Sequence, residues 1–304
     1  MLPIVAAACT TPMDPDRIAL RRGFQPETIV SGPSGLGYVS TLTGGGIEEI
    51  DLRTHAARFV VQPGAIGERV IAGIAYDPGR HQLVACGAWL SQAYVFDAQT
   101  GALLSQIEFP SGLINAVALR GADVYFTESV HPVFYRATRD VDGRFTGPPV
   151  SVPLTGAFHS VSGPTDLNSN GIVAVPGRSE LLIVHSARGE LYRVDPSSGD
   201  AQLVDVGGAD LLGGDGLLLD EQGLVVVQNG EEGRVSLFHL ARDLTSAART
   251  ATLTDPRFRS PTSAARDGAS LWVVDSRLLE IFHGVANPDD AFDLVRVTLP
   301  GAAL

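Results

Sequence analysis

Four oxygen-bearing side chains recur along this 304-residue chain and could bind a metal ion. They open successive sequence repeats and are Glu27, Asn115, Asn170 and Asp215. Two carboxylates and two amide carbonyls, completed by water, form the shell that a hard divalent cation such as Ca²⁺ takes, with about six to eight oxygens. Zinc would need closely spaced His or Cys side chains on one face, and the sequence offers no such pair. The pattern therefore favours calcium, although another divalent cation also fits.

Two of these residues also fit ordinary turn chemistry. Asn170-Gly171 and Asp215-Gly216 are pairs that commonly form tight turns before a strand. Glu27 and Asn115 fit this alternative less well, because Glu is a poor turn residue and Asn115 precedes an alanine. Both interpretations, a metal site and a set of turns, stay open at the level of residue types.

The elements that must position these residues are short strands in a repeated meander. Residues 168–196 (NSNGIVAVPGRSELLIVHSARGELYRVDP) contain three short apolar strands separated by Gly, Pro and Asn, which predicts an antiparallel meander without helix. Similar units begin at Glu27, Ala72, Asn115, Asn170, Asp215 and Pro261, which are 45, 43, 55, 45 and 46 residues apart. This is the period of a four-stranded propeller blade. We predict an all-β, six-bladed β-propeller with four-stranded antiparallel blades around a central channel, closed without exposed sheet edges.

The third repeat is longer than the others. Its extra segment, 138–150 (TRDVDGRFTGPPV), is rich in Gly, Pro and Asp and is predicted to be a surface loop.

In such a blade the first strand begins and the second ends on the same face, so both sets of residues should meet at one mouth of the channel. The predicted second-strand ends are Ser40, Cys86, Glu128, His185, Gln228 and Asp275. Glu128 and His185 are catalytic candidates, the histidine as a proton shuttle near neutral pH. The other pocket candidates are Gln228, Asp275, His131, His159 and Phe158. Hydrogen-bonded residues of the rim or of loops are the better interpretation of these histidines, and a small buried apolar residue is the better interpretation of Cys86.

Composition limits the possible partners. The formal net charge is −12 and all 22 basic residues are arginine, so a nucleic acid or an anionic membrane surface is a poor partner and Schiff-base chemistry is excluded. An acidic chain suits a cation and a small-molecule substrate. A closed ring needs no partner, so we expect a monomer. No stretch is long and apolar enough to span a bilayer.

The chain divides into a lead-in, 1–22, and a single propeller domain, 23–304, with the lead-in able to add an edge strand. Its first residues, MLPIVAAAC, are typical of the end of an export signal, with Cys9 as a possible lipoprotein cysteine. We expect a secreted, periplasmic or cell-surface protein; a disordered Ala-rich terminus of a cytoplasmic protein is the alternative.

The motifs GFQPETIV, INAVAL, NSNGIVAV and GGDGLLLDEQGLVVVQN, together with blades that end in LYRVDP, resemble the SMP-30/gluconolactonase/LRE-like family over residues 23–299. The family consists of calcium-dependent six-bladed propellers, with paraoxonases and diisopropylfluorophosphatase as distant relatives, and the resemblance is strongest to bacterial secreted members. It implies a central calcium held by Glu27, Asn115, Asn170 and Asp215. The chain departs from the family pattern at Ala116, where an acidic residue or glycine is common, and at Gly214, where asparagine is common.

The resemblance implies hydrolysis of a lactone or ester. The metal would bind the substrate carbonyl and water would attack it, with Asp215 as metal ligand and general base. Two alternatives remain: a non-catalytic ligand-binding propeller with structural calcium, and a biosynthetic cyclase or isomerase that uses the same metal site.

Overall fold

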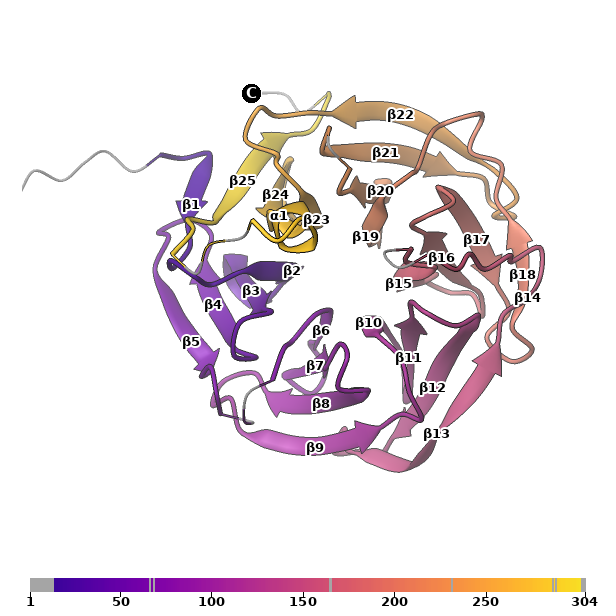
Figure 1. Ribbon diagram of the computed structural model, residues 1–304, viewed down its shortest axis with the longest axis horizontal. Coiled ribbons are helices and arrows are strands. Elements are labelled where there is room, and N and C mark those ends of the chain that lie inside the picture. The colour runs from indigo at the N-terminus through magenta and orange to yellow at the C-terminus, as the bar shows by residue number, and fades with distance from the viewer. Residues whose placement is uncertain are drawn as a thin grey trace, which may run out of the picture.

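The computed structural model describes residues 14–301 apart from positions 66, 68, 164, 165, 231, 286 and 288. Its strands form six sheets arranged as a ring around a central axis (Figure 1), which confirms the predicted six-bladed all-β propeller. In every blade the first strand of the sequence repeat lies innermost, and the later strands of that repeat follow outward in order. The first strands therefore place their side chains around the axis.

The first three blades follow one another in chain order. Blade 1 contains β2 (Pro26–Ser31), β3 (Leu36–Thr41), β4 (Ile47–Asp51) and β5 (Ala57–Val61), with a 3-10 turn at Pro33–Gly35. Blade 2 contains β6 (Ile74–Asp77), β7 (Gln82–Cys86), β8 (Gln92–Asp97) and β9 (Leu103–Glu108). Blade 3 contains β10 (Ile114–Arg120), β11 (Asp123–Glu128), β12 (Val133–Arg139) and β13 (Phe145–Pro153).

The other three blades complete the ring. Blade 4 contains β15 (Ser169–Ala174), β16 (Leu181–His185), β17 (Glu190–Val194) and β18 (Asp200–Leu203), and the short β14 (Thr155–Gly156) adds a parallel edge to β18. Blade 5 contains β19 (Gly214–Asp220), β20 (Gly223–Gln228), β21 (Arg234–Leu240) and β22 (Ala247–Leu253). Blade 6 contains β23 (Pro261–Asp267), β24 (Ser270–Asp275) and β25 (Asp293–Thr298), with helix α1 (Leu278–Phe282) after β24.

The two ends of the chain close the ring together. Strand β1 (Arg17–Ala19) pairs antiparallel with β25 and is the outermost strand of blade 6. An ion pair between Arg17 Nε and Asp293 Oδ1, 2.9 Å apart, joins the same two strands. The lead-in thus supplies an edge strand, and this strand precedes residue 23, the predicted first residue of the propeller. Cys9 and the apolar run before it lie outside the described residues.

The long segment of the third repeat is not a loop, so that prediction was wrong. Strands β12 and β13 form a hairpin in which Thr138 pairs with Thr146 and Arg136 with Val150. The hairpin is held to the neighbouring blade, because Arg144 Nη1 donates to the Leu104 carbonyl at 2.6 Å. The Gly and Pro content that predicted a loop belongs to an outermost strand, where proline is tolerated.

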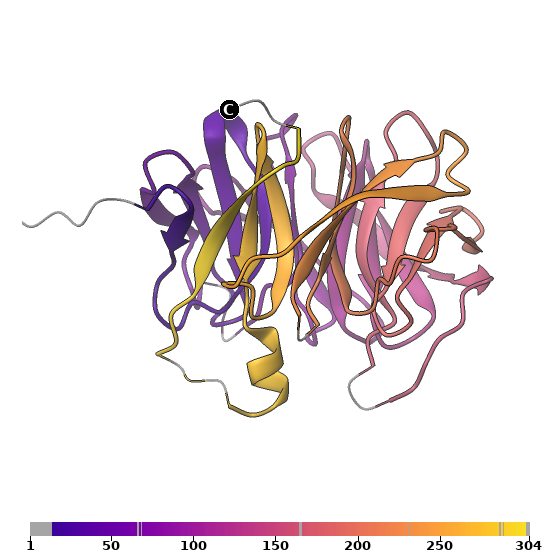
Figure 2. The same ribbon diagram turned by 90° about the horizontal axis from the view of Figure 1, so that it is seen from above.

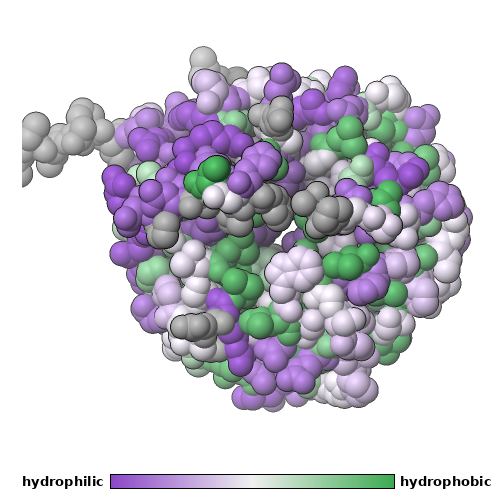
Figure 3. All heavy atoms as spheres, viewed as in Figure 1, coloured by the Kyte–Doolittle hydropathy of each residue, from purple (hydrophilic) through white to green (hydrophobic). Residues whose placement is uncertain are grey.

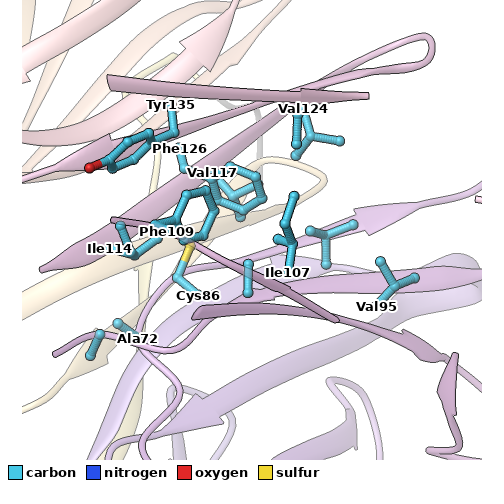
Figure 4. Close-up of a cluster of buried hydrophobic side chains, with 14 of the residues drawn as sticks. Ala72, Cys86, Val95, Ile107, Phe109, Ile114, Val117, Val124, Phe126 and Tyr135 are labelled. Atoms are coloured by element: carbon cyan, nitrogen blue, oxygen red, sulfur yellow. The ribbon is translucent and has the colours of Figure 1, made fainter. Parts of the chain in front are cut away.

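The hydrophobic core lies between neighbouring blades. One cluster of buried side chains, drawn in Figure 4, joins residues of blade 2, including Val95 and Ile107, to residues of blade 3, including Val117 and Phe126. Comparable clusters link the other neighbouring blades. Because each blade packs against the next in this way, the innermost strands are held at a fixed distance from the axis.

Candidate metal centre and its mouth

A β-bulge near the start of the innermost strand recurs around the ring. The pairing register shifts between Ile114 and Val117 in blade 3, and at the equivalent place in blades 1, 4, 5 and 6. The bulged positions hold Glu27, Asn115, Asn170, Asp215 and Thr262. A bulge re-aims a side chain relative to the regular pleat, which is a common device next to functional sites. The sequence placed the last repeat at Pro261, one residue before the bulged position.

Glycine follows the bulged residue where neighbouring blades approach closely. A Cβ on Gly171 would lie 2.1 Å from the Asp215 carbonyl oxygen, and one on Gly216 would lie 2.6 Å from that of Thr262. Neither glycine has a positive φ angle. Turn chemistry is therefore not the reason for these Asn-Gly and Asp-Gly pairs; the absence of a side chain lets the innermost strands converge.

The two carboxylates of this ring are buried and influence each other. Glu27 and Asp215 are 7% and 3% exposed. Burial raises the pKa of Glu27 to about 7. Burial, and after it the charge of Glu27, raises the pKa of Asp215 well above its usual value, while hydrogen bonds from Asn229 and Asn170 oppose the rise. The convergence of the strands thus brings Glu27, Asn170 and Asp215 together.

Arginine side chains neutralise four of the other five buried acids but not these two. The arginine pairs are Glu48 with Arg21, Asp77 with Arg139, Asp275 with Arg259 and Asp293 with Arg17, whereas Glu128 is hydrogen-bonded to the His131 ring and to backbone N–H groups. Within the described ranges, no ion pair includes Glu27 or Asp215. Two adjacent buried carboxylates without a counter-charge are costly unless they are protonated or bind a cation. The donor set of two carboxylates and two amides fits a hard divalent cation.

Two contacts of the ring were not predicted from the sequence. Asn229 Nδ2 donates to Asp215 Oδ2 at 2.7 Å, and Asn115 Nδ2 donates to Ser129 Oγ at 3.0 Å. Asn229 and Ser129 each follow the last residue of a second strand, one position beyond the predicted set. Successive side chains of a strand point to opposite faces. The residue after the strand end therefore points to the ring, whereas the strand-end residue points away from it.

The strand-end residues that were predicted fix the loops of the mouth. Glu128 accepts hydrogen bonds from the backbone N–H groups of Leu113 at 3.0 Å and of His131 at 2.6 Å. Asp275 accepts from the N–H of Arg259 at 2.8 Å, and the Gln228 amide donates to the Leu212 carbonyl at 3.1 Å.

In blade 1 the second strand ends at Thr41 rather than Ser40. Thr41 Oγ1 donates to the Phe24 carbonyl, so it plays the same loop-fixing part. Ser40 Oγ accepts from the N–H of Thr28 at 3.0 Å and so supports the bulge. Cys86 is buried, as expected; burial, and after it the charge of Glu27, raises the pKa of its thiol.

The candidate histidines take part in two contacts, and neither contact includes Glu27 or Asp215. His185 is buried, hydrogen-bonded through Nε2 to the carbonyl of His159 at 3.2 Å, and its ring centroid lies 5.1 Å from that of Phe158. Burial lowers the pKa of His185. His131 is more than half exposed and pairs with Glu128 at 2.8 Å. No hydrogen bond among the described residues joins either pair to Asp215, so the structure does not assemble these candidates into one constellation.

The mouth face is the face of the ring on which the first strands begin and the second strands end. Helix α1 and the loop that precedes β15 project from this face (Figure 2). Beneath the four oxygen-bearing residues a channel of about 400 Å³ continues along the axis, and the innermost strands line it. Its lining begins, in the six blades, at Thr28, Gly73, Ala116, Gly171, Gly216 and Ser263. The ring of bulges therefore separates the mouth from the channel.

The described residues contain no group of three or more His, Cys, Asp or Glu side chains arranged to hold a metal ion. None of their helices has the length and hydropathy to cross a bilayer.

Solved structures with the same architecture include proteins of different kinds. Mala s 1, an allergen of Malassezia sympodialis, has a TM-score of 0.71 at 16% identity, covering 93% of this chain and 96% of the allergen. A luciferin-regenerating enzyme has a TM-score of 0.63 at 13% identity, covering 93% and 94%. Virginiamycin B lyase from Staphylococcus aureus has a TM-score of 0.54 at 12% identity, covering 92% and 99%.

The first two neighbours are six-bladed propellers of the SMP-30/LRE-like type. At these identities the likeness shows the fold alone. No protein-family model matches the chain, and no curated protein matches it in sequence.

Proposed function

We propose that this protein is a calcium-dependent hydrolase of lactones or esters and belongs to the SMP-30/gluconolactonase/LRE-like family. One observation carries the proposal: Glu27 and Asp215 are buried near enough for the charge of one to raise the pKa of the other, and neither has a cationic side-chain partner in the described part of the chain, whereas four of the other five buried acids pair with an arginine. The likeness to a luciferin-regenerating enzyme and to virginiamycin B lyase supports an enzyme on this fold.

Glu27, Asn115, Asn170 and Asp215 would hold the ion, with further positions left to water and substrate. When bound, Ca²⁺ supplies positive charge that polarises a carbonyl group and stabilises negative charge developing on its oxygen. In Asn115 the amide nitrogen is engaged by Ser129, which leaves the carbonyl end of the amide for the ion.

Asp215 would orient the attacking water and accept its proton. The hydrogen bond from Asn229 Nδ2 to Oδ2 fixes the plane of this carboxylate. A carboxylate that is held in place and shielded from bulk water is suited to act as a general base. The proposal does not require His185 or Glu128 in proton transfer, because both are engaged by the backbone of the mouth loops; a catalytic role for either stays a prediction.

The test is hydrolysis of a small panel of lactones and aryl esters by chelator-treated protein, before and after calcium is restored. Turnover that disappears with chelator and returns with calcium is the expected result. Absence of turnover across the panel, together with a fall in melting temperature on chelation, would assign the ion a structural role and favour a binding or biosynthetic propeller.

A further inference from the structure

Blade 2 differs from the other blades at the mouth. Its ring position is Ala72, and its second strand ends in Cys86, followed by Gly87 and Ala88. The other blades place a polar side chain at the strand end, namely Thr41, Glu128, His185, Gln228 and Asp275. Neither the ring position nor the strand end of blade 2 therefore carries a hydrogen-bonding side chain, apart from the buried Cys86 thiol.

The turn that follows β7 presents two large apolar side chains to solvent. Trp89 is 66% exposed and Leu90 is 44% exposed. Ala88 and Ser91 have φ angles of 49° and 52°, in the left-handed region that non-glycine residues seldom adopt. Hydrogen bonds from Leu90 N to the Gly87 carbonyl at 3.1 Å and from Ser91 Oγ to the Gly112 carbonyl at 2.9 Å hold the turn. A fixed, strained turn that exposes a tryptophan is a feature more typical of a binding site than of a solvated loop.

The surroundings of this turn are apolar as well. Leu42 and Leu167 are partly buried and pack against the same cluster as Ala72 and Ala88. Val130, in the corresponding turn of blade 3, is 39% exposed. Figure 3, which views the mouth face, shows hydrophobic side chains beside the central hollow. We call the set Leu42, Ala72, Ala88, Trp89 and Leu90 the blade-2 sector.

We propose that the blade-2 sector binds an alkyl or aryl arm of the substrate while the reacting carbonyl lies over Glu27, Asn170 and Asp215. This inference rests on the proposed function and specifies its substrate class: esters or lactones with an apolar substituent, rather than polyhydroxylated lactones. Substrate hydroxyl groups placed over blade 2 would lose their hydrogen bonds to water without gaining hydrogen bonds to the protein. An alkyl chain placed there would instead move from water into contact with apolar side chains, which is favourable.

Hydrolysis of 4-alkyl γ-lactones of increasing chain length tests the sector directly. We expect kcat/KM to rise roughly two- to fourfold for each added methylene, as for partly to fully buried CH₂ groups. Trp89→Ser should flatten this dependence without abolishing turnover of the shortest lactone. Val141→Ser is the matched control, because Val141 is 86% exposed in the β12–β13 turn on the opposite face, and it should leave the dependence unchanged.

A binding measurement separates this inference from the proposed function. Trp89 is the exposed tryptophan of the chain and Trp272, the other one, is 1% exposed, so ligand contact with the turn should shift tryptophan emission to shorter wavelength. The probes are 4-alkyl γ-lactams, which keep the ring carbonyl but resist hydrolysis. We expect Kd to fall roughly two- to fourfold per methylene, and the emission shift to vanish in Trp89→Phe.

Each pattern of results has one meaning. If lactam binding depends on chain length but no lactone is hydrolysed, the blade-2 sector binds an apolar arm and the proposed hydrolase function is refuted. If the rate of hydrolysis does not depend on chain length, in the wild type and in Trp89→Ser alike, the proposed role of the blade-2 sector is overturned while the proposed hydrolase function stands. A larger emission shift with phosphatidylcholine vesicles than with any lactam would also overturn it, because the turn would then be a lipid-docking surface.

Discussion

Two sets of buried polar residues face each other at the mouth, and they differ in how their polar atoms are satisfied. At the strand ends, Glu128, Gln228 and Asp275 are bonded to the backbone of neighbouring loops, and the acids also pair with His131 and Arg259. In the ring, the charge of Glu27 raises the pKa of Asp215, and neither acid has an ion-pair partner in the described part of the chain. Burial and polarity are the same in both sets. What distinguishes a candidate reactive site from a structural one is the charge that the protein leaves uncompensated.

The largest expected difference is in catalysis. Asp215→Asn removes the proposed base and one anionic ligand, so hydrolysis should fall by about 10³-fold or more. Glu128→Gln, at an equally buried carboxylate, should retain activity within about tenfold, because its partners are loop N–H groups. Steady-state kinetics in saturating calcium measure both. Comparable losses in the two variants would remove the distinction between ring and strand end.

The next difference is in the free energy of unfolding, where loss of a strand-end carboxylate should destabilise the protein and loss of a ring carboxylate should not. Glu128→Ala leaves several backbone N–H groups unpaired, so the free energy of unfolding should fall by about 3 kcal/mol. Glu27→Gln should leave the chelator-treated protein as stable as the wild type or more so, since it removes a buried charge that lacks a cationic partner. Urea denaturation in chelator tests the pair, and a destabilised Glu27→Gln variant would contradict the account.

The stability of the metal-free protein should depend on pH through the buried carboxylates Glu27 and Asp215, which have no cationic partner among the described residues. The pKa of Glu27 is raised from 4.5 to about 7 by burial, so between these values the folded protein holds a proton that the unfolded chain releases. The contribution of Glu27 to stability in chelator should therefore decrease as pH rises from about 4.5 to about 7, by on the order of 3 kcal/mol, and the raised pKa of Asp215 acts in the same direction. It is measured as the difference in unfolding free energy between wild type and Glu27→Gln at each pH, because acids with a lowered pKa, such as Asp77 and Glu180, act in the opposite direction in both proteins. Saturating calcium should remove the decrease. A wild type that gains stability relative to Glu27→Gln as pH rises over this range in chelator would refute the unpaired-carboxylate description.

The smallest effect concerns the residues that orient the ring. Asn229→Ala removes the hydrogen bond to Asp215 Oδ2, and we expect kcat to fall roughly 10- to 100-fold with little change in unfolding free energy. Ser276→Ala, at the equivalent position of blade 6, is a control that should change kcat by less than about twofold. An unchanged kcat in Asn229→Ala would show that the orientation of Asp215 is set elsewhere.

The fold could be predicted because turns and strands alternate clearly in the sequence. The predicted strands of residues 168–196 match β15, β16 and β17 within a few residues, since Gly, Pro and Asn mark their limits. The outer hairpin β12–β13 could not be predicted in this way. The Gly-Pro-Pro run of β13 is typical of a loop, but its structure is decided by pairing with β12 and by contacts with blade 2.

The ring residues could be found from their spacing, but their environment could not. That Glu27 and Asp215 are neighbours, 188 positions apart in the chain, follows from closure of the ring. The cations that neutralise the other acids are also distant in sequence, as in Arg139 and Asp77, 62 positions apart. Asn229 and Ser129 were missed because the prediction considered only the strand ends Gln228 and Glu128, which are correct, whereas the side chains that contact the ring stand one residue beyond them.

Calorimetric titration of chelator-treated protein with calcium measures whether the ring residues hold an ion. We expect one ion per chain, with binding abolished in Glu27→Gln/Asp215→Asn and retained in Glu128→Gln/Asp275→Asn. Absence of binding in the wild type, or binding that survives in the ring variant and disappears in the strand-end variant, would contradict this expectation.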